Sequence, residues 1–130
     1  RIAQEMSPTY RKDMCSYAPS SIIGKVLGIS PKGEVYGWVV DPEAIIPVKV
    51  NFWENGILRG TVSIRYDMLD VRLLYPWFYF NQGFYWKAPY NILSDGGTHV
   101  IYVWAADRNS DGTFGSYQLQ NSPITLPKFP

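Results

Sequence analysis

The chain has 130 residues, the length of one ordinary domain. Its 12 basic and 11 acidic residues leave a net charge of +1, so no strong positive field is available to attract nucleic acid. No uninterrupted apolar run of roughly 18 residues occurs, which excludes an ordinary membrane-spanning helix. Cys15 is the only cysteine, which excludes an intramolecular disulfide.

Aromatic residues are unusually frequent. Five Trp, ten Tyr and six Phe make up 16% of the chain. Some of them are expected in the core, because aromatic rings fill the interior of a β-sandwich well. They outnumber what one small core can hide, so several are expected on the surface.

Residues 1–20 show no regular periodicity and are expected to form an extended lead-in or linker. Residues 21–130 are expected to form a β-sandwich binding module, because short apolar runs alternate there with turn residues. The expected strands are Ile22–Ile29, Glu34–Val40, Val48–Glu54, Ile57–Arg65, Gly83–Lys87, Thr98–Ala106 and Tyr117–Leu126. The predicted fold is all-β: an antiparallel β-sandwich, immunoglobulin-like or jelly-roll-like, of about seven to eight strands.

Three connections have distinctive sequences. Asn55-Gly56 suits the two positive-φ positions of a type I′ hairpin turn, so the strands on either side of it should pair. The stretch 66–76 lacks the alternating pattern of a strand and favours a short helical turn that Pro76 ends. The stretch 91–97 is expected to be a loop.

Strand alternation predicts which side chains point into the core. The expected inward side chains are those of Val50, Phe52, Phe84, Trp86, Ile101, Val103 and Ala105, and Trp38 is expected in the core beneath the sheet. The expected outward side chains are those of Trp53, Tyr85, Tyr102 and Trp104.

Several short sequence motifs follow one another along the chain in a characteristic order. They are Gly37-Trp38-Val39-Val40-Asp41-Pro42, Val48-Lys49-Val50 with Asn55-Gly56, Asp70-Val71 with Tyr75-Pro76, Gly83-Phe84, and Gly97-Thr98-His99 with Ala105-Ala106-Asp107. Over roughly residues 22–126, this order resembles an accessory β-sandwich module of secreted and envelope-associated bacterial proteins. The resemblance implies a secreted or cell-surface location and a β-sandwich fold.

The stretch after Pro76 is the first candidate site. It consists of Trp77, Phe78, Tyr79, Phe80, Asn81 and Gln82. Exposed aromatic rings bind sugar rings and anchor protein interfaces, and the two amides could hydrogen-bond hydroxyl groups. The alternative interpretation is that two or three of the rings fold back and close the end of the sandwich.

The outward set Trp53, Tyr102 and Trp104 is the second candidate, either as a carbohydrate platform or as a subunit contact. The competing interpretation is that residues 1–20 cover these rings.

The sequence contains no complete motif for a catalytic site or a metal site. Asp107, Asn109 and Asp111 match the first half of a calcium loop, but the twelfth position is Gln118 instead of the usual Glu. A metal site is therefore not expected, and neither is a cofactor. His99, the only histidine, is expected to be structural, since no nucleophile motif accompanies it. No catalytic residues are expected, and the chain is interpreted as a non-enzyme.

The sequence favours a non-catalytic, adhesive or ligand-binding module of a bacterial surface protein, with a cell-surface glycan as the first ligand class and a protein ligand as another. The alternative is a structural or assembly module, for example the tip of an oligomeric surface fibre, whose aromatic rings contact another copy or another domain.

Overall fold

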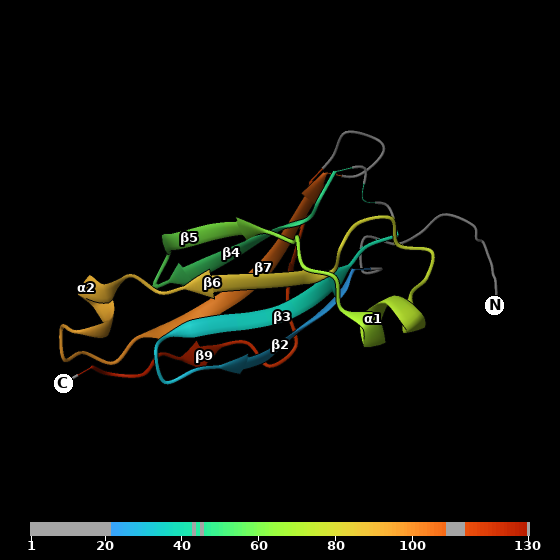
Figure 1. Cartoon of the computed structure of the whole chain (residues 1–130). Helices are drawn as coiled ribbons and strands as arrows, with labels where there is room; N and C mark the ends of the chain where they lie inside the picture. Colours follow the sequence, from blue (N-terminus) through green and yellow to red (C-terminus); the bar gives the residue numbers. More distant parts are fainter. Residues whose placement is uncertain (1–21, 43, 45, 109–113, 130) are drawn as a thin grey trace.

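The computed structural model describes residues 22–42, 44, 46–108 and 114–129. Within this part of the chain, eight strands form two antiparallel sheets that face each other (Figure 1). The first sheet has the order β2 (Ile23–Ile29), β3 (Glu34–Val40), β6 (Gly83–Lys87). The second has the order β5 (Ile57–Ser63), β4 (Lys49–Glu54), β7 (Val100–Arg108), β8 (Phe114–Gln118), and β9 (Ile124–Thr125) pairs with the start of β7. The predicted all-β sandwich is confirmed.

The last expected strand, Tyr117–Leu126, is divided between β8 and β9. Asn121 has a φ of +68°, outside the strand region, and Pro123 has no N–H to donate to a neighbouring strand. These two residues therefore end one ladder before the next begins.

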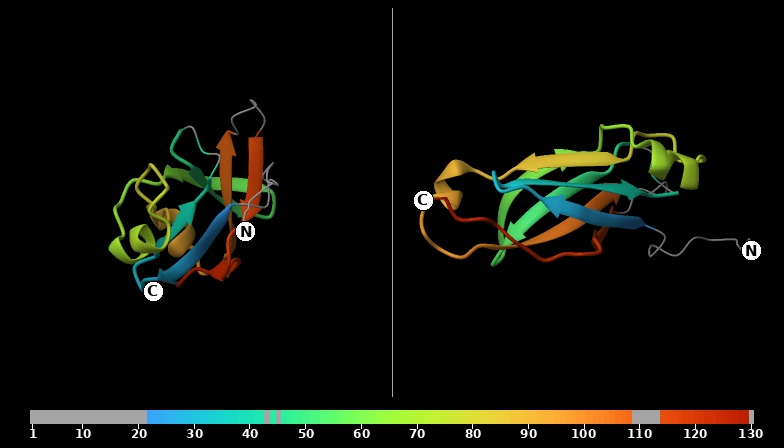
Figure 2. Two further views of the ribbon diagram at one scale, coloured as in Figure 1. Left: turned by 90° about the vertical axis from the view of Figure 1, so that its right-hand side faces the viewer. Right: turned by 60° about the horizontal axis from the view of Figure 1, so that its bottom comes forward.

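Two short helices accompany the sheets. α1 (Leu69–Leu74) lies within the stretch where a helical turn was predicted. α2 (Tyr90–Leu93) was expected to be loop; it follows Pro89 and turns Ile92 and Leu93 into the core. Figures 1 and 2 show α1 and α2 at opposite ends of the sandwich. No helix in the described ranges is long and apolar enough to cross a membrane.

The core lies between the sheets and contains the side chains that alternation predicted. Ile101, Val103 and Ala105 are fully buried. Phe52 of one sheet stacks on Trp86 of the other, with ring centroids 4.3 Å apart. A Cβ atom on Gly60 would lie 2.2 Å from the Trp86 indole nitrogen, so the glycine makes room for the largest ring of the core.

Trp38 corrects the expectation that it lies in the core. Val35 and Val39 of β3 are fully buried, so Trp38 shares the opposite, outer face of the strand with Tyr36. Trp38 is half-buried there, because the ring of Tyr75 packs on it with centroids 5.8 Å apart. The outer face of the three-stranded sheet is consequently rich in aromatic side chains.

Candidate functional site

The outer face of the five-stranded sheet carries a shallow groove of about 470 Å³. We call it the tryptophan groove. Its lining residues are Trp53, Asn55, Gly56, Tyr102, Trp104 and Ser116. The structure therefore brings together the three aromatic residues that alternation placed on the outside.

Strand register explains how the groove forms. Trp53 of β4 lies directly opposite Tyr102 of β7, and Trp104 follows on the same face two residues later. Among the described residues, none of these three rings packs against another aromatic ring, so the three do not stack on one another. The tight turn at Asn55 and Gly56 forms one end of the groove, and Ser116 of β8 adds a hydroxyl group.

The aromatic loop 77–80 divides its four rings between solvent and core. Trp77 is 54% exposed and Tyr79 is 90% exposed, whereas Phe78 is only 8% exposed and belongs to the core. Phe80 is half-buried and packs against the same core. The loop thus closes the end of the sandwich with two rings and leaves two at the surface.

The two amides of this candidate site serve the fold. Gln82 is 2% exposed, and its side-chain oxygen accepts a hydrogen bond from the Met68 backbone N–H at 3.0 Å. Asn81 is exposed and donates to the backbone oxygen of Arg65 at 3.1 Å. These bonds hold the chain before α1 against the chain before β6, and Gln82 has no surface from which to reach a ligand.

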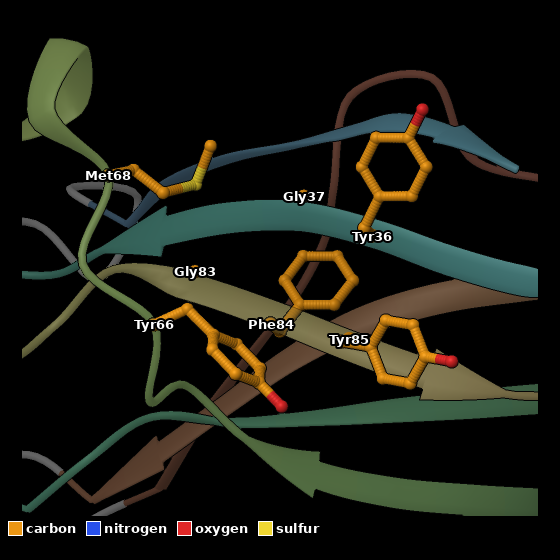
Figure 3. A pocket seen from close by; sticks show the side chains of 7 residues that line it. All are labelled: Tyr36, Gly37, Tyr66, Met68, Gly83, Phe84 and Tyr85. Atoms are coloured by element: carbon orange, nitrogen blue, oxygen red, sulfur yellow. The ribbon is translucent and has the colours of Figure 1, made fainter.

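A second hollow, of about 390 Å³, lies on the outer face of the three-stranded sheet. We call it the tyrosine pocket. It is lined by Tyr36, Gly37, Tyr66, Met68, Gly83, Phe84 and Tyr85 (Figure 3). Sequence reasoning missed this pocket, because it expected Trp38 in the core, and Tyr36 lies two residues before Trp38 on the same face of β3.

His99 bridges two carboxylates, in keeping with a structural role. Its Nδ1 lies 2.6 Å from Glu54 Oε2, and its Nε2 lies 2.9 Å from Asp95 Oδ1. Because ionised carboxylates only accept hydrogen bonds, both ring nitrogens donate when the imidazole is charged. The Asp95 hydrogen bond is the main cause that raises the pKa of His99, burial opposes it, and Glu54 adds to the rise. Arg59 also pairs with Glu54, at 2.9 Å.

Of the three residues that match a calcium loop, Asn109 and Asp111 lie outside the described residues, and Asp107 lies in β7. Within the described ranges no three His, Cys, Asp or Glu side chains are grouped as metal ligands.

Comparisons with known proteins give no significant match to the chain. No family model matches it, and neither a curated protein nor a solved structure shows a significant match. The fold and the two hollows are therefore the basis for a functional proposal.

Proposed function

We propose that this chain is a non-catalytic ligand-binding module of a secreted or surface-exposed bacterial protein, with a glycan as its ligand. The observation that carries the proposal is the tryptophan groove, where Trp53, Tyr102 and Trp104 line one hollow on the outer face of the five-stranded sheet. Residues 1–20, which the competing interpretation places over these rings, lie outside the described residues. The resemblance of residues 22–126 to bacterial envelope modules supports the location.

The chemistry of the groove suits a sugar. A pyranose ring has an apolar face of C–H groups, which packs on an aromatic ring, and a rim of hydroxyl groups, which needs hydrogen-bonding partners. The groove offers the rings together with the polar side chains of Asn55 and Ser116. It stands on rigid strands, so little conformational entropy is lost when a ligand binds.

The exposed rings of the aromatic loop are a second surface for the same function. Trp77 and Tyr79 project from a loop whose other two rings anchor it in the core. Anchoring of this kind presents the two outer rings in a fixed position, which favours recognition over a purely structural role.

The test is an array of bacterial and host glycans, followed by titration of the best binder against Tyr102→Ala and Trp53→Ala. Each lost ring is expected to weaken binding by about 1–3 kcal/mol, on the scale of base stacking and interface hot spots. Tyr90→Ala is the matched control, because Tyr90 is an exposed tyrosine on α2 and does not line the groove. Absence of glycan binding, or equal loss in the control, contradicts the proposal.

The aromatic loop needs a separate comparison. Trp77→Ala with Tyr79→Ala is expected to leave the melting temperature nearly unchanged and to weaken binding if the loop contributes. Phe78→Ala is expected to cost about 3–5 kcal/mol of folding stability, as for other buried rings. A large stability loss in the Trp77 and Tyr79 variant, without a separate binding defect, would remove the loop from the proposal.

One observation favours a second function, that of an assembly module. Leu69, Leu73 and Leu74 of α1 are all exposed, and Leu73 and Leu74 reach 70%. Exposed leucines contribute nothing to sugar recognition, whereas apolar surface of this kind is common where proteins associate. On this alternative, α1 and the neighbouring Trp77 contact another subunit or another domain.

A further inference from the structure

The tyrosine pocket lies on the sheet opposite the tryptophan groove. Figure 3 shows Tyr36 and Tyr85 on one side of it, Met68, Tyr66 and Gly83 on the other, and Gly37 and Phe84 between the two sides. All three tyrosines are exposed to solvent at their rims. The volume of about 390 Å³ lies within the range of sites that hold small molecules.

Glycines create the hollow. Tyr36 and Tyr85 are register partners on adjacent strands, so their side chains stand next to each other and form one wall of the pocket. A Cβ atom on Gly28 would lie 2.6 Å from the Tyr36 hydroxyl oxygen, which shows that Tyr36 leans over β2. A Cβ atom on Gly83 would lie 2.9 Å from the Tyr66 backbone oxygen, so the segment carrying Tyr66 lies close against the start of β6.

Two of the rings are held by partners outside the pocket. The Tyr85 hydroxyl donates to Glu34 Oε2 at 2.6 Å, and the other oxygen of Glu34 accepts from Ser30 at 2.8 Å. The guanidinium carbon of Arg65 lies 5.5 Å from the centre of the Tyr66 ring. These contacts organise the walls before a ligand arrives, which lowers the entropic cost of binding.

The sheet edges beside the pocket are already hydrogen-bonded. On the β6 side, the Gly83 N–H donates to the Tyr66 oxygen at 2.7 Å and the Tyr66 N–H donates back at 3.1 Å. On the β2 side, the Val26 N–H donates to the Gln120 oxygen at 2.9 Å. An extended peptide therefore cannot add as a strand at these positions, which favours a compact ligand over a polypeptide.

We infer that the tyrosine pocket binds a small aromatic compound of about the size of a substituted phenol. Tyrosine rings favour edge-to-face and offset contacts with another aromatic ring, and the Met68 thioether is a favourable partner for a ring edge. A sugar suits this pocket less well than the tryptophan groove, because the Tyr85 hydroxyl is already bonded to Glu34 and the remaining lining is mainly apolar. This inference goes beyond the proposed glycan function and does not depend on it.

The test is a titration with p-cresol followed by nuclear magnetic resonance. We expect saturable shifts at the backbone amides of Gly37 and Gly83 and at the Met68 methyl group, with a dissociation constant of about a millimolar or lower, as for other ligands of this size. The size-matched 4-methylcyclohexanol and methyl glucoside are expected to bind at least about tenfold more weakly, since neither has an aromatic ring.

Variants on the two sheets separate this site from the glycan site. Tyr36→Ala is expected to weaken p-cresol binding about tenfold and to leave glycan binding unchanged, whereas Tyr102→Ala is expected to do the reverse. If Tyr36→Ala does not fold, the shift map of the native protein and the two non-aromatic compounds decide the question. Shifts that do not saturate, that spread over the surface, or that arise equally with methyl glucoside would overturn the inference.

Discussion

Gly56 contributes to this fold through its backbone conformation. Asn55 and Gly56 have φ values of +49° and +77°, the two left-handed residues that a two-residue hairpin between β4 and β5 requires. A Cβ atom on Gly56 would have no neighbour within 4 Å. Any cost of a side chain there therefore comes from the backbone conformation, since no steric contact is made.

We expect Gly56→Ala to lower the stability by about 1 kcal/mol and Gly56→Val by at least that much, because a side chain disfavours the left-handed region. The measurement is chemical unfolding of the two variants beside the native chain. Asn55→Gly is the control, because glycine adopts positive φ freely and should leave the stability within about 0.5 kcal/mol of the native value. Native stability in the Gly56→Val protein would argue against the turn.

At the scale of elements, His99 connects parts of the chain that are not neighbours in sequence. It stands just before β7 and contacts Glu54 at the end of β4 and Asp95 in the turn after α2. Because Glu54 directly follows Trp53 and precedes the Asn55-Gly56 turn, the same contact braces the turn end of the tryptophan groove.

This arrangement predicts how stability depends on pH. Folding raises the pKa of His99 above 6.5, chiefly through Asp95, so its contribution is complete below pH 6.5 and is lost as the pH rises through the folded-state pKa. Folding lowers the pKa of Asp95 below 3.8, chiefly through His99, so that contribution is present above pH 3.8 and is lost as the pH falls through the lowered pKa.

We therefore expect the stability difference between the native chain and His99→Gln to be larger at about pH 5.5 than at about pH 8.5. Chemical unfolding of both proteins at the two pH values measures it. Asp95→Asn should reduce the same pH dependence, since it removes the larger of the two carboxylate interactions. A difference that stays constant between the two pH values would contradict the arrangement, because it would show that folding does not shift the pKa of His99.

At the scale of the whole molecule, the exposed side chains on which the proposals rest lie on the two outer faces of the sandwich and at its α1 end. The groove and the pocket are hollows suited to ligands, whereas the leucines of α1 protrude. The ligand-binding and assembly proposals consequently predict different states in solution.

A monomer in sedimentation equilibrium, together with the glycan binding described above, is the outcome expected of a binding module. If the chain forms a stable dimer or trimer, Leu73→Glu with Leu74→Glu should return it to the monomer, because buried charge at an interface is costly. Lys87→Glu is a suitable control, since it changes the charge of an exposed residue on β6, away from α1. An oligomer that survives the leucine changes would remove α1 from the assembly proposal.

Local patterns were sufficient to predict the β-sandwich, the bounds of β3 and β6, the hairpin at Asn55-Gly56 and the outward set of the tryptophan groove. These features depend on turn residues and on a side-chain period of two, and both can be read within a few residues of sequence. The division of the loop 77–80 could not be read in this way, because burial of Phe78 depends on what lies beneath it.

The tertiary structure decided the outer position of Trp38, the tyrosine pocket and the bridge between His99 and Glu54. Each depends on which strands become neighbours and in which register: β3 pairs with β6, and the two bridge residues are 45 positions apart. Periodicity assigns a residue to one of two faces, but it does not say which face meets the other sheet or what crosses over it. That choice is made when the whole core packs, because only then do Val35 and Val39 bury fully and leave Tyr36 and Trp38 outside.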